Sequence, residues 1–282
     1  MKKWNLIFDV ALCTGCRNCE MAVKDEYVGN THAGYTAEMP RHGPGWVQIR
    51  ARERGQFPAV DVTNLFHSCQ HCDDAPCMQA AKNGAITKRP DGLVQFHPER
   101  AKGQKAIVEA CPFRAAYWNE ELQLPQHWTF DSHLLDAGWT EPRPVQSCPT
   151  GALRSLKVED EEMQRIIAEQ KLEHIEPGSM TKSRVHMRNL YRYMRAFVAG
   201  TLTVTKNGIE DCVVGASVTL TRGTEHVAEA SSDDFGDFRF DDLIPRSTDM
   251  RIRITAPGYR EQVLDIEVGN SRWLGEIRLE PA

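Results

Sequence analysis

The last third of the chain alternates apolar and polar residues in short runs. These runs occupy residues 200–204, 216–220, 238–240, 250–254, 263–268 and 275–279. Turn-forming residues separate them, as at Asp234-Phe235-Gly236 and Pro257-Gly258. A period of two with regular turns is typical of strands that bury one face. The pattern predicts an all-β sandwich of about seven strands over residues 197–282.

The first part of the chain, residues 1–158, has no long periodic segment and is rich in Cys, Pro, His and Gly. Such a region buries little apolar surface and needs a metal or covalent staple. Residues 159–173 predict a helix, because acidic residues fill the first turn and Met163, Ile166 and Ile167 share a face. An irregular arm follows to residue 196. We therefore expect an α+β protein with segments 1–158, 159–196 and 197–282.

Charge and hydropathy exclude two classes of partner. The 282 residues include 26% charged residues and carry a net charge of −5, so no nucleic-acid partner is expected. No apolar run reaches the length of a membrane span. The first residues, with Asp9 after a short apolar stretch, lack the long apolar region of a signal peptide. We expect a cytoplasmic protein; export together with a partner that carries a signal is the alternative.

The nine cysteines carry the candidate chemistry. Eight of them lie between residues 13 and 148. Two closely spaced triplets and two single cysteines, each followed by proline, make up the eight: Cys13, Cys16 and Cys19; Cys69, Cys72 and Cys77; Cys111; and Cys148. The first triplet has the spacing of the first three cysteines in a bacterial ferredoxin run. Cys212 stands alone, and we expect it to be a small buried core residue.

Eight thiolates are the number that two [4Fe–4S] cubes require, since each iron takes one cysteine. Structural zinc is the rival interpretation, but four-cysteine zinc sites usually pair two C-x2-C knuckles, and neither single cysteine has one. Disulfides are a third possibility. His67 and His71 flank the second triplet, and we interpret both as neighbours of the site that do not bind iron.

These motifs resemble the four-motif iron–sulfur subunits of molybdopterin oxidoreductases of the dimethyl sulfoxide reductase type. In that family, motifs I and IV share two clusters, and motifs II and III share two more. Here the fourth cysteine of motif I is Val23 and that of motif II is Ala81, while motifs III and IV keep only Cys111 and Cys148. The resemblance implies one cluster on Cys13, Cys16, Cys19 and Cys148, and a second on Cys69, Cys72, Cys77 and Cys111.

A closer resemblance covers nearly the whole chain. It is to the small subunits of pyrogallol–phloroglucinol transhydroxylase and of resorcinol or dihydroxybenzoate hydroxylases. The residues that carry it are 34–37, 52–55, 117–121, 133–136 and the arm at 189–192. The C-terminal segment also matches and is similar to carboxypeptidase-regulatory or transthyretin-like domains. The transhydroxylase subunit has a third cluster, whereas this chain has Val23, Trp128 and Asp131 at three of the expected cysteine positions.

The resemblance implies an electron-transfer subunit of an oxidoreductase, in a heterodimer with a large catalytic subunit. That partner would hold the molybdenum bis-pterin cofactor and hydroxylate or transhydroxylate di- or trihydroxybenzenes in anaerobic aromatic degradation. This chain would have no catalytic residue of its own, and its external electron acceptor is not identified. A self-standing ferredoxin-like carrier and the beta subunit of another molybdopterin oxidoreductase are the alternatives.

The lost third cluster generates a structural expectation. Empty space in a protein interior is costly. We therefore expect Val23 and Trp128 to be buried near each other as ordinary core. Asp131 should either face solvent or accept hydrogen bonds from backbone N–H groups or an arginine, since a buried unpaired carboxylate is expensive.

Overall fold

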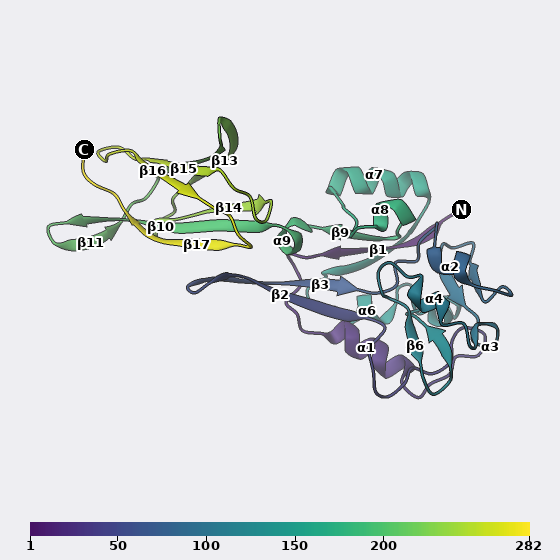
Figure 1. Cartoon of the computed structure of the whole chain (residues 1–282). Helices are drawn as coiled ribbons and strands as arrows, with labels where there is room; N and C mark the ends of the chain where they lie inside the picture. Colours follow the sequence, from purple (N-terminus) through teal and green to yellow (C-terminus); the bar gives the residue numbers. More distant parts are fainter. The chain divides into compact units, whose positions relative to one another are not determined.

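The computed structural model describes all residues from 1 to 282, and they form two compact units (Figure 1). The cysteine-rich unit comprises Met1–Ala51 and Asn64–Leu190, and the sandwich unit comprises Arg52–Thr63 and Tyr191–Ala282. This division differs from the predicted segment limits in two ways. Residues 159–190 belong to the cysteine-rich unit, and residues 52–63 belong to the sandwich unit.

A three-stranded sheet forms the centre of the cysteine-rich unit. Its order is β8 (Leu153–Val158), β1 (Lys3–Asp9), β9 (Val185–Arg188), with β8 antiparallel and β9 parallel to β1. From Trp4 onward every residue of β1 is buried, as expected of a central strand. Two small hairpins accompany this sheet: β4 (Ile86–Lys88) with β5 (Val94–Phe96), and β6 (Tyr117–Asn119) with β7 (Leu124–Gln126).

The helices of this unit are short, apart from two. They are α1 (Asn18–Tyr27), α2 (Pro76–Ala80), α3 (Pro98–Ala101), α4 (Ala106–Glu109), α5 (Ser132–Asp136), α6 (Arg143–Gln146), α7 (Asp160–Gln170) and α8 (Gly178–Thr181). The helix predicted over residues 159–173 is confirmed as α7. Its Met163 is buried with Ile7 of β1, while Ile166 and Ile167 pack against the same cluster.

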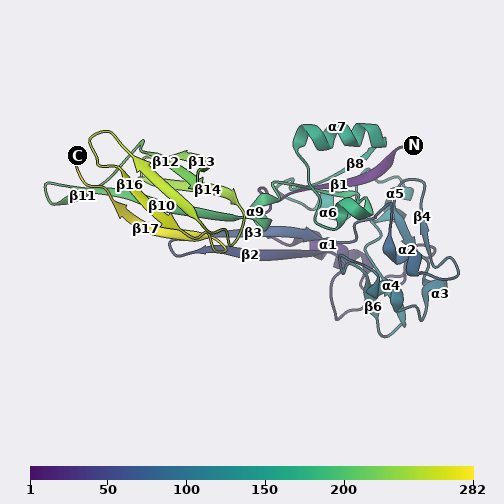
Figure 2. The ribbon, with the colours of Figure 1, turned by 45° about the horizontal axis from the view of Figure 1, so that its top comes forward.

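The sandwich unit contains a short helix, α9 (Tyr191–Met194), and two four-stranded sheets (Figures 1 and 2). One sheet comprises β10 (Ala196–Lys206), β11 (Ile209–Cys212), β14 (Asp237–Leu243) and β17 (Arg272–Arg278). The other has the order β13 (Glu225–Ser231), β12 (Ser217–Arg222), β15 (Met250–Thr255), β16 (Gln262–Ile266). The structure thus has eight strands here, where the sequence predicts about seven.

The alternation seen in the sequence separates core from surface in both sheets. In β15, Met250, Ile252 and Ile254 are buried while the arginines between them are exposed. These residues belong to one apolar cluster with Leu202 of β10 and Phe240 of β14, so the two sheets pack face to face. The prediction that Cys212 is a buried core residue is wrong. Cys212 is exposed, because it lies on β11 at the edge of its sheet, where every residue is exposed.

A β-hairpin, β2 (Gln48–Gln56) and β3 (Ala59–His67), contributes its end to the sandwich unit. There Asp61 pairs with Arg54, Arg192 and Arg239, and the Arg54 side chain is fully buried. The Arg239 guanidinium lies 4.0 Å from the centroid of the Phe197 ring. A shared carboxylate and aromatic packing therefore attach the hairpin end to the sandwich strands.

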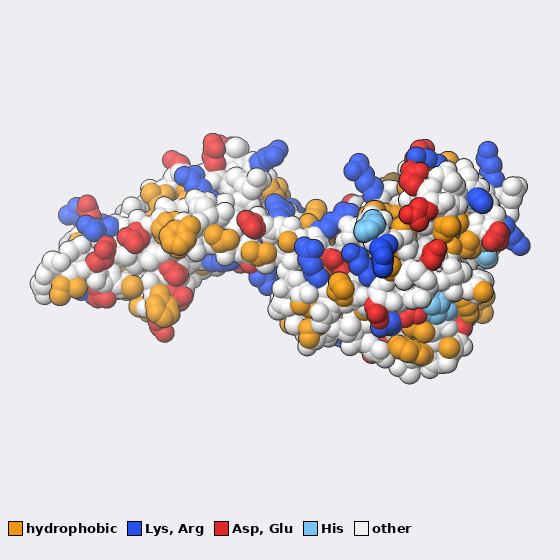
Figure 3. All heavy atoms as spheres, turned by 90° about the horizontal axis from the view of Figure 1, so that it is seen from below, with side chains coloured by type: hydrophobic (Ala, Val, Ile, Leu, Met, Phe, Trp, Pro, Cys, Tyr) orange, Lys and Arg blue, Asp and Glu red, His pale blue; other side chains and the backbone are white.

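No helix of the structure is long and apolar enough to cross a membrane. The space-filling view shows apolar side chains scattered among charged ones on the visible face of the sandwich unit, at the left (Figure 3). Scattered exposed apolar residues are normal on protein surfaces.

The first prediction concerns Asp61. Replacement by asparagine leaves the buried Arg54 guanidinium without a counter-charge, so the sandwich unit should lose about 3–5 kcal/mol of stability at neutral pH. Burial opposes ionisation of Asp61, but its arginine partners outweigh burial and hold its pKa below the ordinary value. Its stabilisation is therefore present at neutral pH and disappears as the pH falls through that lowered pKa.

Hydrogen exchange of the β10 amides, measured at several pH values, tests this prediction. The matched control is Asp265→Asn, because Asp265 pairs with Arg251 in an exposed ion pair and should leave the exchange unchanged. Equal exchange in the two variants would show that the Asp61 contacts do not stabilise the unit.

Candidate iron–sulfur sites

The first triplet and Cys148 come together at one end of the central sheet. Strand β1 ends at Asp9, shortly before Cys13, and β8 begins at Leu153, shortly after Cys148. These strands are antiparallel with Phe8 opposite Leu153, so the two cysteine segments meet at the same edge. The four side chains line one cavity together with apolar residues that include Phe8, Ile49 and Ala152.

A glycine allows the tight turn inside the first triplet. Gly15 has a φ of +72°, and a Cβ there would lie 2.9 Å from Oδ1 of Asn64. Only glycine adopts this conformation without a steric cost. The Asn64 side chain in turn donates a hydrogen bond to the Cys13 carbonyl oxygen at 3.2 Å. This contact holds the loop with the Cys13 and Cys16 side chains turned toward the cavity.

The second triplet and Cys111 also converge. Cys69 and Cys72 follow β3, Cys77 lies in α2, and Cys111 follows α4, which contacts α2. Cys72, Cys77 and Cys111 belong to one apolar cluster with residues such as Ile107. Lys88 fixes the loop by donating hydrogen bonds to the carbonyl oxygens of residue 71 at 2.7 Å and of residue 72 at 2.9 Å. Ala115 N–H donates to Cys111 Sγ at 3.4 Å.

Burial disfavours thiolates in both groups. It raises the pKa of Cys19 and of Cys77 to about 12, and it raises the pKa of Cys69 well above the ordinary value. Neighbouring thiolates add to each rise: Cys13 and Cys148 act on Cys19, and Cys111 acts on Cys69 and Cys77. Four converging thiolates in such a place need bound cations.

The donor chemistry of both groups fits a [4Fe–4S] cube. All nine cysteines are free thiols, and each group brings together three sulfurs from one triplet segment and a fourth from a distant part of the chain. Four cysteine sulfurs are the ligand set of such a cluster. The structure therefore brings together the residues that the sequence assigns to each site, while their role as ligands stays a prediction.

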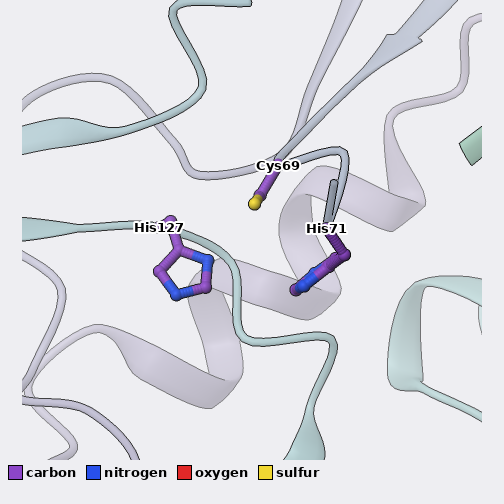
Figure 4. Close-up of side chains that lie close together, drawn as sticks. All are labelled: Cys69, His71 and His127. Atoms are coloured by element: carbon purple, nitrogen blue, oxygen red, sulfur yellow. The ribbon is translucent and has the colours of Figure 1, made fainter. Parts of the chain in front are cut away.

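Two histidines flank Cys69 (Figure 4). Donor atoms of Cys69, His71 and His127 all lie within 4.8 Å of one another. Burial lowers the pKa of His71 well below the ordinary value and that of His127 to about 3. His67 is apart from this group, with its Nε2 at 2.7 Å from the Phe113 carbonyl oxygen. Sequence spacing gave no signal for His127, which lies 58 positions after Cys69.

Val23, Trp128 and Asp131, which stand where the resemblance predicts cysteines, belong to the protein core. Val23 and Trp128 are buried, as predicted. Asp131 is also buried and accepts hydrogen bonds from Tyr27 Oη at 2.7 Å, Trp128 Nε1 at 2.9 Å and the Arg143 backbone N–H at 2.8 Å. The prediction that Asp131 would accept hydrogen bonds if not exposed is confirmed. Tyr27, one helical turn after Val23, is the partner that sequence reasoning missed; the closeness of Val23 to Trp128 stays a prediction.

Burial raises the pKa of Asp131, and the donors from Tyr27, Trp128 and Arg143 oppose that rise. A second group of polar side chains surrounds Glu26, the residue before Tyr27. His133 Nε2 lies 2.8 Å from Glu26 Oε1, and Arg143 Nη1 donates to Glu26 Oε2 at 2.5 Å. These contacts outweigh the burial of Glu26 and lower its pKa. Asp131 and Glu26 are thus linked through Arg143 in one hydrogen-bond network, which also includes Tyr27, Trp128 and His133.

Comparison with known proteins agrees with this arrangement. Residues 60–158 match the 4Fe-4S dicluster domain, and residues 198–280 match the carboxypeptidase regulatory-like domain. The pyrogallol hydroxytransferase small subunit of Pelobacter acidigallici is 38% identical over 94% of this chain and 95% of its own. The thiosulfate reductase electron transfer subunit PhsB of Salmonella typhi is 29% identical over 59% of this chain and 82% of its own.

The arsenate respiratory reductase iron-sulfur subunit ArrB of Shewanella sp. (strain ANA-3) is 31% identical over 49% of this chain and 53% of its own. The predicted resemblance is confirmed, as is the expectation of an iron–sulfur subunit that transfers electrons. The C-terminal β-rich region is confirmed as well.

The second prediction concerns the Asp131 network. Tyr27→Phe removes one donor from a buried carboxylate and should cost about 1–3 kcal/mol of stability. Hydrogen exchange of the α1 amides measures this loss. Tyr35→Phe is the control, because Tyr35 donates to Asp136 at 2.8 Å at an exposed position and should have little effect. A Tyr27→Phe variant as stable as the control would contradict the proposed importance of the network.

Proposed function

Because the chain belongs to the family of the pyrogallol hydroxytransferase small subunit, we propose that it transfers electrons for a larger molybdopterin-containing subunit acting on di- or trihydroxybenzenes. The observation that carries this proposal is 38% identity over nearly the full length of both chains. The two groups of four cysteines support it. A cytoplasmic location, a heterodimer and the sandwich unit as an assembly module are parts of the same proposal.

The cluster ligands are part of the proposal. Cys13, Cys16, Cys19 and Cys148 hold one [4Fe–4S] cluster, and Cys69, Cys72, Cys77 and Cys111 hold the other. The bound clusters would supply one-electron steps. The protein contributes the thiolates, the N–H of Ala115 toward Cys111, and apolar walls such as Phe8 and Ile107 that limit access of water.

The number of clusters in the proposal is two. Tyr27, Trp128 and Arg143 satisfy Asp131 at a position that the three-cluster pattern would give to a cysteine. A third cube would have to displace this buried network. Its positions also offer valine, tryptophan and a carboxylate in place of thiolates.

The direction of electron flow distinguishes two possible partner reactions. A hydroxylase that takes oxygen from water converts an aromatic C–H bond to C–OH, releasing two electrons and two protons, so the clusters would carry electrons out. A transhydroxylase has no net electron flow, and its clusters would serve as a reservoir. The related small subunit is named for a pyrogallol hydroxytransferase, which favours trihydroxybenzenes as the first substrates to test.

The third prediction is the iron content and its dependence on Cys148. Anaerobically purified protein should contain about eight irons, four for each cube. Cys148→Ala should lower the iron content and alter the electron paramagnetic resonance (EPR) spectrum of one cluster. Cys111→Ala should alter the other cluster. Cys212→Ala is the matched control, because this exposed thiol lies on β11 and should leave both spectra unchanged.

Two results would contradict this assignment. An iron content near twelve would mean a third cluster with non-cysteine ligands. Alteration of the same cluster by Cys111→Ala and Cys148→Ala would refute the proposed pairing of single cysteines with triplets.

The fourth prediction is an obligate partner. Affinity purification of the chain from its own organism should recover a larger subunit that contains molybdenum. The complex should convert pyrogallol, resorcinol or dihydroxybenzoate, and only a hydroxylase should need an added electron acceptor. Recovery of the chain alone, with both clusters reducible, would favour a self-standing ferredoxin-like carrier.

A further inference from the structure

Two buried histidine rings face the sulfur of Cys69 from different parts of the chain. His71 lies in the cysteine loop itself, while His127 directly follows β7 (Figure 4). Both are 1% exposed, and the sulfur points between the two rings. One donor atom from each ring and the Cys69 sulfur lie within 4.8 Å of one another.

The hydrogen bonds of His71 fix the position of its proton. The Val94 backbone N–H donates to His71 Nδ1 at 3.1 Å, so Nδ1 is an acceptor without a proton. With Nδ1 accepting a hydrogen bond, the proton of the ring lies on Nε2. This Nε2 is buried and has no hydrogen-bond partner. An unpartnered buried N–H is costly, which indicates that a partner belongs there.

His127 has the same requirement. Neither of its ring nitrogens has a hydrogen-bond partner, and both are buried. Its other neighbours are aromatic: the Phe96 ring centroid lies 4.0 Å away and the His71 centroid 5.7 Å away. Apart from sulfur, the Trp128 backbone lies close enough to influence the pKa of both rings, but neither ring makes a geometrically acceptable hydrogen bond with it.

We propose that His71 and His127 donate N–H hydrogen bonds to the sulfurs of the cluster held by Cys69, and thereby raise its reduction potential. This inference rests on the proposed function, because it requires that cluster. Reduction adds one negative charge that is spread over the cluster and its thiolates. Hydrogen bonds to the sulfurs stabilise that charge and are among the factors that set the potential. Both histidines act on the sulfurs of the cluster and of its ligand Cys69, and neither binds iron.

His127 provides the sharper test, because His71 has a φ of +45° that most replacements would strain. His127→Leu removes the N–H, whereas His127→Gln retains a side-chain N–H donor. His186→Leu is the matched control: this histidine is also buried with an unpartnered Nδ1, but its ring contacts His174 and Asn5. The measurement is an anaerobic redox titration followed by EPR, with iron analysis of every variant.

We expect His127→Leu to retain about eight irons and to lower the potential of one cluster. The ratio of reduced to oxidised cluster should fall about tenfold at a given potential, which is about 59 mV for a one-electron couple. His127→Gln should lie nearer the unchanged protein, and His186→Leu should leave both potentials unchanged. Pulsed EPR of the reduced unchanged protein should detect a ring nitrogen coupled weakly to the cluster, as for a nitrogen not bound to iron.

Several results would overturn the inference. An unchanged potential in His127→Leu with all irons present would show that the ring does not tune the cluster. Loss of that cluster's irons in His127→Leu, or a strong nitrogen coupling in the unchanged protein, would make His127 an iron ligand. Absence of any nitrogen coupling would also refute the hydrogen bond, independently of how the variants fold. If the protein without substitutions contained no iron after anaerobic purification, the proposed function itself would be refuted.

Discussion

The cysteine-rich unit brings cysteine side chains together in two groups. The thiols of one group cannot all ionise unless cations are bound between them. Most of its helices have only four or five residues, and six of the eight cysteines of this unit lie outside the helices. The antiparallel pairing of β1 with β8 brings chain segments 135 positions apart, at Cys13 and Cys148, to one cavity. Bound clusters would join these segments, so metal binding and folding are coupled. Bound cations would offset the rise in pKa that burial imposes on Cys19 and Cys69.

Hydrogen bonds as well as packing accommodate the residues that stand where the resemblance predicts further cysteines. Val23 and Trp128 supply apolar bulk, but Asp131 is a carboxyl group in a fully buried position. Two side-chain donors and one backbone donor satisfy it. The ring of Tyr27 also packs against Trp46, with centroids 4.9 Å apart. Asp131 is therefore a polar core site, and loss of one donor would leave a half-satisfied buried carboxylate, which is worse than none.

The sequence predicts what depends on local spacing and misses what depends on distant contacts. Triplet spacing and the two Cys-Pro pairs predict which cysteines form the candidate sites. The alternation of apolar and polar residues predicts the inner strands of the sandwich. It does not reveal β11 and β13, because these edge strands are mostly exposed: all of β11 is exposed, and in β13 only the small residues Ala228 and Ala230 pack against the core. Cys212 was misjudged for the same reason. Tyr27 and His127 were not found because a single residue acquires its role only from partners far along the chain.

The sandwich unit is built from two separate stretches of the chain, because it includes the end of the β2–β3 hairpin. Its end, Arg52–Thr63, groups with the sandwich unit although it lies before the second cysteine triplet in sequence. Gly55, with a φ of +81°, is required there, because a Cβ would lie 2.6 Å from Cζ of Phe197. Arg54 has no exposed side-chain surface. Its guanidinium pairs with Asp61 and donates a hydrogen bond to the Arg195 carbonyl oxygen at 3.2 Å.

A chain truncated before residue 197 would lack Phe197, which packs against the Arg54 guanidinium. The truncation would therefore expose this buried group on β2. Strand β3 begins within the sandwich unit and ends at His67, two residues before Cys69.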